Sequence, residues 1–195
     1  MDPGEPVMPK ANPKSLRPDR THQFSPGFFA RVGGLLYLII IAAGLFAEVV
    51  SRGRLIVPFD PAQTASNISA HQTLYRLGIA ADVSTFLTAI VVTVILYSLL
   101  KGVNGHVALA MVFFNLVQDA IGGINILNTY RPIQLLGDAS YLDAFSPDQL
   151  RSLALLALKT HAFGFGIALL FFGPSCLALG YLVFKSGFFP RLLGY

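Results

Sequence analysis

Ionisable side chains inside long apolar stretches are the residues of this chain best suited to chemistry. They are Glu48, Arg76, Asp82, Asp119, Lys159 and His161. If these stretches cross a membrane, each charged side chain at mid-bilayer costs roughly 2.5 to 3.5 kcal/mol on insertion scales. Groups that are this costly serve a structural or functional purpose, and they mark ion pairs, proton relays and solute paths in membrane proteins.

Asp119 is the most deeply placed of these residues. It lies 13 residues beyond the start of its apolar stretch at His106, which corresponds to roughly 20 Å of helix. A span needs about 20 residues, and counting back from the ends of the neighbouring stretches leaves Asp82, Lys159 and His161 near a membrane interface. Asp119 is therefore the best candidate for a buried ionisable group.

A polar stripe runs through the same stretch. Its members, at spacings of one, three or four residues, are Asn115, Gln118, Asp119, Gly122 and Asn125. These spacings place them on one face of a helix, and such a face must contact protein or water rather than lipid. We expect Asp119 to face the bundle interior and to pair with a group from a neighbouring helix. The nearest candidates are Lys159 and Arg76, whose long side chains can reach inward from an interface.

The polar cluster is open to three interpretations. The first is a non-enzymatic protein with a structural or partner-binding role, in which these residues form interhelical hydrogen bonds and ion pairs. The second is a small transporter or permease-like protein with an outward-facing polar cluster around Asp119. The third is a membrane-embedded enzyme. A water-filled cavity that reaches Asp119 favours the second, whereas a dry, fully paired Asp119 favours the first.

Familiar catalytic motifs do not occur in the chain. It has no nucleophile elbow, no paired-histidine zinc helix and no phosphate-binding loop. His161, Asp82 and Asp119 could together ligate an ion, but their spacing does not require it. The single cysteine, Cys176, cannot form an internal disulfide or a dithiol pair. We therefore predict no catalytic residue, no metal and no cofactor.

The composition indicates that lipid is the solvent of this protein. Of 195 residues, 54% are hydrophobic and only 12% are charged, whereas soluble domains carry about 25% charged residues. The mean hydropathy is +0.62. No basic stripe interleaves with aromatic residues, so nucleic acid is not an expected partner. The expected partner is the lipid bilayer.

The order of segments along the chain predicts an all-α bundle. Residues 1–30 contain six of the twelve prolines, which is typical of a disordered tail, and this one is basic. Residues 31–195 form a transmembrane domain with apolar stretches at 32–50, 74–100, 106–127 and 153–184. Each stretch is long enough to span a bilayer as a helix. Helix-start signals occur at Asp60-Pro61 and Ser146-Pro147, and Gly187 is a helix-stop signal.

The distribution of basic residues predicts that both termini are cytoplasmic. With the N-terminus inside, eight Lys and Arg residues lie on the inner side and six on the outer side. This bias follows the positive-inside rule. The lengths of the connections agree with it, because the connection at 101–105 is short and both outer connections exceed 20 residues.

Several stretches together resemble one family of bacterial membrane proteins, domain of unknown function 4386. They are residues 33–38 (GGLLYL), 65–68 (ASNI), 75–80 (YRLGIA), 96–101 (LYSLLK) and 180–191 (GYLVFKSGFFPR). The resemblance implies a multi-pass helical protein of the bacterial inner membrane, with no established activity and no functional residues to transfer. It also implies that the chain is C-terminally shortened, because family members continue into further hydrophobic helices where this chain stops at Tyr195.

Reporter fusions test the predicted topology. Fusions after Lys101 and Lys185 are expected to report a cytoplasmic location, and fusions near Asp60 and Asp143 an external one, because of the basic bias. Paired phosphatase and fluorescent-protein reporters at the four positions give the measurement. An external C-terminus would contradict the predicted orientation of the polar cluster.

Overall fold

The computed structural model describes residues 26–187, so most of the predicted tail lies outside the described residues. All regular structure within residues 26–187 is helical. The elements are α1 (Pro26–Leu45), the π-helix η2 (Phe46–Arg52), α2 (Gly53–Leu55), α3 (Pro61–Ala70), α4 (Gln72–Leu100), α5 (Gly105–Leu135), the 3-10 helix η3 (Ser140–Leu142) and α6 (Pro147–Ser186).

Four helical segments of the described chain are long and apolar enough to cross a membrane. They are Gly27–Leu55, which joins α1, η2 and α2, followed by Gln72–Leu100, Gly105–Leu135 and Pro147–Ser186. Each contains one of the apolar stretches read from the sequence, so the prediction of an all-α protein with four such helices is confirmed.

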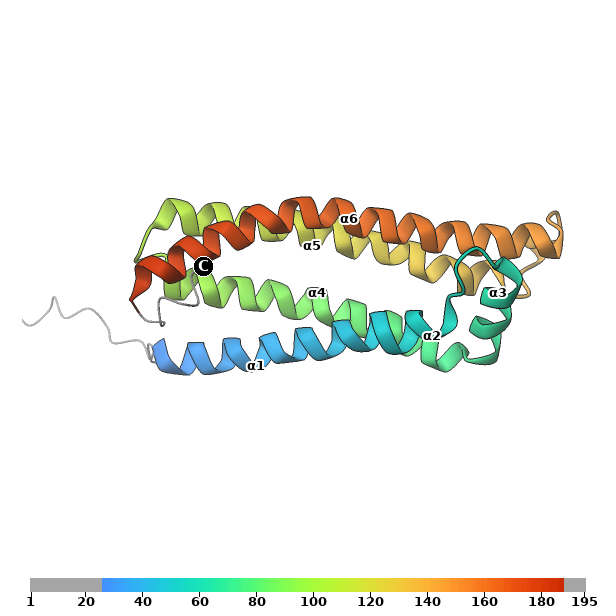
Figure 1. The fold of residues 1–195 in the computed structure, drawn as a ribbon, viewed down its shortest axis with the longest axis horizontal. Helices are drawn as coiled ribbons and strands as arrows, with labels where there is room; N and C mark the ends of the chain where they lie inside the picture. The colour runs from blue at the N-terminus through green and yellow to red at the C-terminus, as the bar shows by residue number, and fades with distance from the viewer. Residues whose placement is uncertain (1–25, 188–195) are drawn as a thin grey trace, which may run out of the picture.

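The four long helices form two layers (Figure 1). α1 packs against α4, and α5 packs closely against α6; the two layers meet mainly where α4 contacts α5. α1 begins and α6 ends at the same end of the bundle, beside the α4–α5 turn, and we call this the turn end (Figure 1). The opposite end carries α2 and α3, and we call it the loop end.

Local capping chemistry defines where the helices begin and end. The Asp60 side chain accepts a hydrogen bond of 2.8 Å from the Gln63 backbone N–H, and Ser146 and Gln149 form a reciprocal capping box. Gly187 ends α6 in the left-handed conformation, with φ of +66°, which glycine adopts without a steric penalty. The predicted start and stop signals are thus confirmed.

Two small apolar clusters close the bundle at its ends. The loop-end cluster contains Leu55, Ile68, Tyr75 and Leu158. The turn-end cluster contains Leu100, Ala108, Met111 and Leu182. The loop-end cluster is reinforced because the Tyr75 hydroxyl donates a 2.6 Å hydrogen bond to the Thr129 carbonyl oxygen. These clusters hold the layers together at both ends and leave the middle to the polar residues.

The α5–α6 contact relies on a glycine. A Cβ atom at Gly164 would lie between 2.6 and 3.0 Å from three side-chain atoms of Asn125. Asn125 cannot easily yield, because it is buried and its amide donates a 2.8 Å hydrogen bond to the His161 carbonyl oxygen. Small residues permit this kind of close approach between membrane helices.

Replacing Gly164 by alanine is expected to destabilise the protein by about 1 to 3 kcal/mol, the usual cost of overpacking a well-packed contact. The matched control is Gly166→Ala on the same helix, where a Cβ would meet nothing within 4 Å. Thermal unfolding in lipid nanodiscs measures both variants. Equal unfolding midpoints for the two would contradict the assigned contact.

Candidate functional site

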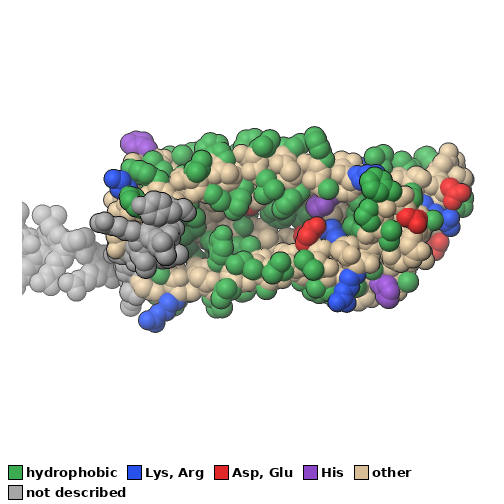
Figure 2. All heavy atoms as spheres, in the orientation of Figure 1, with side chains coloured by type: hydrophobic (Ala, Val, Ile, Leu, Met, Phe, Trp, Pro, Cys, Tyr) green, Lys and Arg blue, Asp and Glu red, His purple; other side chains and the backbone are tan. Residues whose placement is uncertain are grey.

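A cavity of about 990 Å³ lies between the two layers. The space-filling view shows this face hollowed between the upper and lower layers, with charged side chains and histidine gathered toward the loop end (Figure 2). Because the long helices run along the bundle axis, this face is one that a bilayer would cover. The hollow in this face thus opens sideways (Figure 2), and residues of both α1 and α6 line the cavity.

The cavity brings together most of the polar residues selected from the sequence. The selected residues that line it are Glu48, Asp82, Asn115, Gln118, Asp119, Lys159 and His161. Arg76 is the exception: it is exposed on α4 and does not line the cavity. The clustering of these residues follows from helix periodicity, because each lies on the face that its helix turns toward the other layer.

The sequence analysis missed one residue of the site, Arg52. Its guanidinium donates two hydrogen bonds to the Asp82 carboxylate, from Nη1 to Oδ2 and from Nη2 to Oδ1, the latter at 3.1 Å. Its Nε also donates to Glu48 Oε2 at 2.9 Å. The side chains of Arg52 and Asp82 are only 12% and 11% exposed. The four-residue spacing of Glu48 and Arg52 could have indicated their ion pair from the sequence.

The π-helix η2 brings Arg52 to this position. The predicted stretch ended at residue 50, whereas the helical segment continues through η2 to Leu55. η2 packs directly on α4, because Ser51 sits against Gly78, where any Cβ would clash with it. The Ser51 hydroxyl also donates to the Leu74 carbonyl oxygen at 3.3 Å. Single π-helical turns are frequent at functional sites.

Asp119 faces the interior as predicted, but the expected ion pair is not formed. The residue is 6% exposed, and neither carboxylate oxygen has a hydrogen-bond partner among the described residues. Arg76 points away at the surface. Lys159 is engaged elsewhere, because its Nζ lies 4.7 Å from the centre of the Phe59 ring. The predicted pairing of Asp119 with Lys159 or Arg76 is therefore wrong.

Phe59 explains why Lys159 is not available to Asp119. Phe59 is the one non-glycine residue within 26–187 that has a positive φ, +66°. This conformation is uncommon for a bulky side chain, and it presents the ring to Lys159 at the loop end. A cation over an aromatic face is attracted by the electrons of the ring. Lys159 thus lies over Phe59 and not beside Asp119.

Two polar neighbours of Asp119 on its own stripe, Asn115 and Asn125, form hydrogen bonds to other helices. The Asn115 amide donates to Thr93 Oγ1 at 3.3 Å, and its Oδ1 accepts from the Ser175 hydroxyl at 2.7 Å. His161 Nδ1 lies 3.3 Å from the Asn125 carbonyl oxygen. These interactions tie α5 to α4 and α6. Asp119 takes part in none of them.

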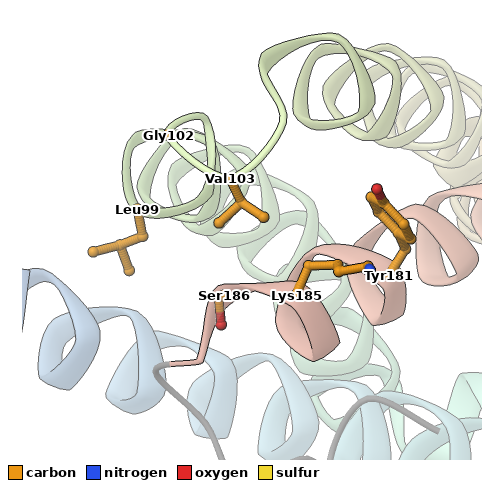
Figure 3. Close-up of a pocket in the computed structure, with 6 residues that line it drawn as sticks. All are labelled: Leu99, Gly102, Val103, Tyr181, Lys185 and Ser186. Atoms are coloured by element: carbon orange, nitrogen blue, oxygen red, sulfur yellow. The ribbon is translucent and has the colours of Figure 1, made fainter.

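A second cavity, of about 630 Å³, lies at the turn end. Its lining is Leu99, Gly102, Val103, Tyr181, Lys185 and Ser186, with the Lys185 side chain extended along α6 toward Tyr181 (Figure 3). None of the selected residues lines it. Within residues 26–187, no three His, Cys, Asp or Glu side chains are grouped so that they could hold a metal ion. The larger cavity is therefore the candidate site.

This arrangement defines an all-helical membrane protein with a largely apolar cavity between its helix layers, in which a cluster of polar residues gathers. Residues 32–195 match the family described as Domain of unknown function (DUF4386), and the chain belongs to that family. No curated protein is detectably similar to the chain, and no solved structure is either. The resemblance read from the sequence is thereby confirmed.

Two substitutions are expected to show that the paired and the unpaired side chains contribute differently to stability. Arg52→Gln leaves Asp82 buried without its partner and is expected to lower the free energy of unfolding by about 3 kcal/mol. Asp119→Leu removes an unpartnered group, whose burial costs about 1 to 3 kcal/mol, and is expected to leave stability unchanged or raised. Thermal unfolding in nanodiscs measures both.

The control for the ion pair is Arg151→Gln. Arg151 and Asp148 form an exposed pair at 3.0 Å, and exposed pairs contribute only about 0 to 1 kcal/mol. A marked destabilisation by Asp119→Leu would show that this carboxyl group supports the fold.

Proposed function

We propose that the protein is a solute-binding membrane protein of the transporter or permease kind, whose solute occupies the cavity beside Asp119. One observation supports this most: the Asp119 carboxyl group is 6% exposed, has no partner among the described residues and lines a cavity of about 990 Å³. Buried polar groups are nearly always hydrogen-bonded. A group left unpaired beside a cavity is available to a molecule that enters it.

A structural role accounts less well for this residue. The side chains that hold the helices together form hydrogen bonds elsewhere, as Tyr75 does with Thr129 and Ser175 with Asn115. Asp119 forms no such hydrogen bond among the described residues. An enzyme that acts by nucleophilic catalysis would need a nucleophile within reach of a base. Within residues 26–187, neither Asp119 nor His161 hydrogen-bonds a Ser, Thr or Cys side chain.

We place the protein in the bacterial cytoplasmic membrane, with both termini in the cytoplasm and the loop end outside. The basic bias of the sequence supports this orientation. α1 begins and α6 ends at the same end of the bundle (Figure 1). This agrees with both termini lying on one side of the membrane. In this orientation the charged end of the cavity faces outward, and the apolar remainder extends toward the inner leaflet.

Filling the cavity tests the proposal. Gly44 lines the cavity, and a Cβ there would meet nothing within 4 Å, so Gly44→Phe adds a ring at the cavity wall from a position that has room for a side chain. The control is Gly34→Phe on the same helix, where a Cβ also meets nothing within 4 Å and the residue is outside the cavity lining.

The probe is octanol carrying a photoreactive diazirine, in phosphatidylcholine nanodiscs, with adducts mapped by peptide mass spectrometry. The expected result is labelling of cavity residues such as Ala89 and Leu155, reduced about tenfold or more by Gly44→Phe and unchanged by Gly34→Phe; a tenfold loss corresponds to about 1.4 kcal/mol of binding free energy. Labelling confined to the lipid-facing surface, or insensitive to Gly44→Phe, would overturn the proposal.

A further inference from the structure

We propose that the solute has an apolar body and a primary amine, and that the amine pairs with Asp119. This inference rests on the proposed solute-binding function and adds the chemical class of the ligand. Three features of the cavity lead to it: the composition of its wall, its sideways opening and the balance of charges that face it.

The wall of the cavity suits an apolar molecule that arrives from the bilayer. Beyond the charged cluster the lining is apolar, and it includes Ile40, Ile41, Leu96, Phe172 and Leu179. α1 packs against α4 and η2, and the hollow between the layers is visible on the bilayer-covered face (Figure 2). A ligand dissolved in lipid can therefore enter sideways, without crossing the loop end.

The charges that face the cavity select the polar group of the ligand. Three carboxylates and two cations line it, with His161 beside them; the charged residues are Glu48, Arg52, Asp82, Asp119 and Lys159. Arg52 binds both Glu48 and Asp82, and Lys159 lies over Phe59. Asp119 is the one carboxyl group of the lining that has no partner within 26–187. A cationic hydrogen-bond donor is its chemical complement.

A proton transfer completes the match. An isolated ionised carboxylate in apolar surroundings is so costly that the group binds a proton instead. An amine in the bilayer can arrive as the neutral base. The Asp119 O–H bond then breaks as an N–H bond forms on the amine, which leaves an ammonium–carboxylate pair and no change in total charge. Such charge-assisted hydrogen bonds are roughly twice as strong as neutral ones.

The position of the carboxylate sets one requirement. Each Asp119 oxygen has less than 1 Å² of accessible surface, although the residue lines the cavity. The side chain must therefore turn into the hollow to meet the amine. Gln118, on the same stretch of α5, also lines the cavity, and its amide oxygen can accept a hydrogen bond from one of the remaining ammonium N–H groups.

Ligands that share one chain and differ in the head group test the inference. Octylamine, octanol, octanoate and octyltrimethylammonium compete with the photoreactive octanol for the wild-type protein in phosphatidylcholine nanodiscs. Octylamine is expected to displace the probe at a concentration about tenfold or more below that of octanol, because a hydrogen bond to a charged group is the stronger one. Octyltrimethylammonium has no N–H to donate and is expected to compete no better than octanol.

Asp119→Asn tests whether Asp119 is responsible for the preference for the amine. It keeps the size of the side chain and removes its charge, so octylamine is expected to fall to the potency of octanol while the neutral probe still labels the cavity. That labelling shows that the variant is folded. The control is Asp148→Asn, which alters an exposed carboxylate outside the cavity lining and is expected to retain the preference for the amine.

The outcomes separate this inference from the proposed function. If octanol and octylamine compete equally in the wild type, or octanoate competes best, the amine is wrong while the solute-binding cavity stands. If the probe never labels the cavity, both fail. Repeating the competition in phosphatidylethanolamine nanodiscs distinguishes two sources of the amine: loss of probe labelling without added octylamine indicates a lipid head group, and unchanged labelling indicates a free amine.

Discussion

The two-pronged ion pair between Arg52 and Asp82 fixes the first spanning segment to the rest of the bundle. α1 continues into η2 within one helical segment, and both pack against α4, so the ion pair fixes the loop end of this segment to α4. Burying either charge alone, away from water, is strongly destabilising. A buried pair is stable only when its geometry satisfies the hydrogen bonds of both groups. The π-helix supplies that geometry, and Gly78 allows Ser51 to approach close enough for it.

The need of buried polar groups for partners also explains the arrangement around the cavity. Apolar clusters join the layers at both ends, while between them the largely apolar cavity borders polar groups that must be satisfied by one another. Most of them are: Asn115, Thr93 and Ser175 form one chain of hydrogen bonds, and Asn125 joins α5 to the α6 backbone. Asp119 lies in the middle of this region without a bond. The contrast between it and its satisfied neighbours is the reason to propose that Asp119 binds a ligand.

Features that depend on a few neighbouring residues could be predicted from the sequence. Helix starts at Asp60 and Ser146 and the stop at Gly187 are capping chemistry within one turn, and all three occur. The polar stripe on α5 follows from helix periodicity, and Asp119, Gly122 and Asn125 on that stripe are indeed buried. The four long apolar helices follow from hydropathy and length alone. Their bounds extend beyond the apolar stretches because the caps lie in the connections.

By itself, the sequence determined the class of protein, the number of long apolar helices and which face of α5 is polar, because these properties are local and periodic. Only the tertiary structure decided which charges meet. Arg52 belonged by composition to a connection, yet it pairs with Asp82 across 30 positions of the chain, and Lys159 is held by Phe59 rather than by Asp119. Long side chains reach several ångströms in many directions, so their partners depend on how neighbouring helices are shifted and rotated. Spacing along one chain contains no information about those shifts, and the unpaired Asp119 is their result.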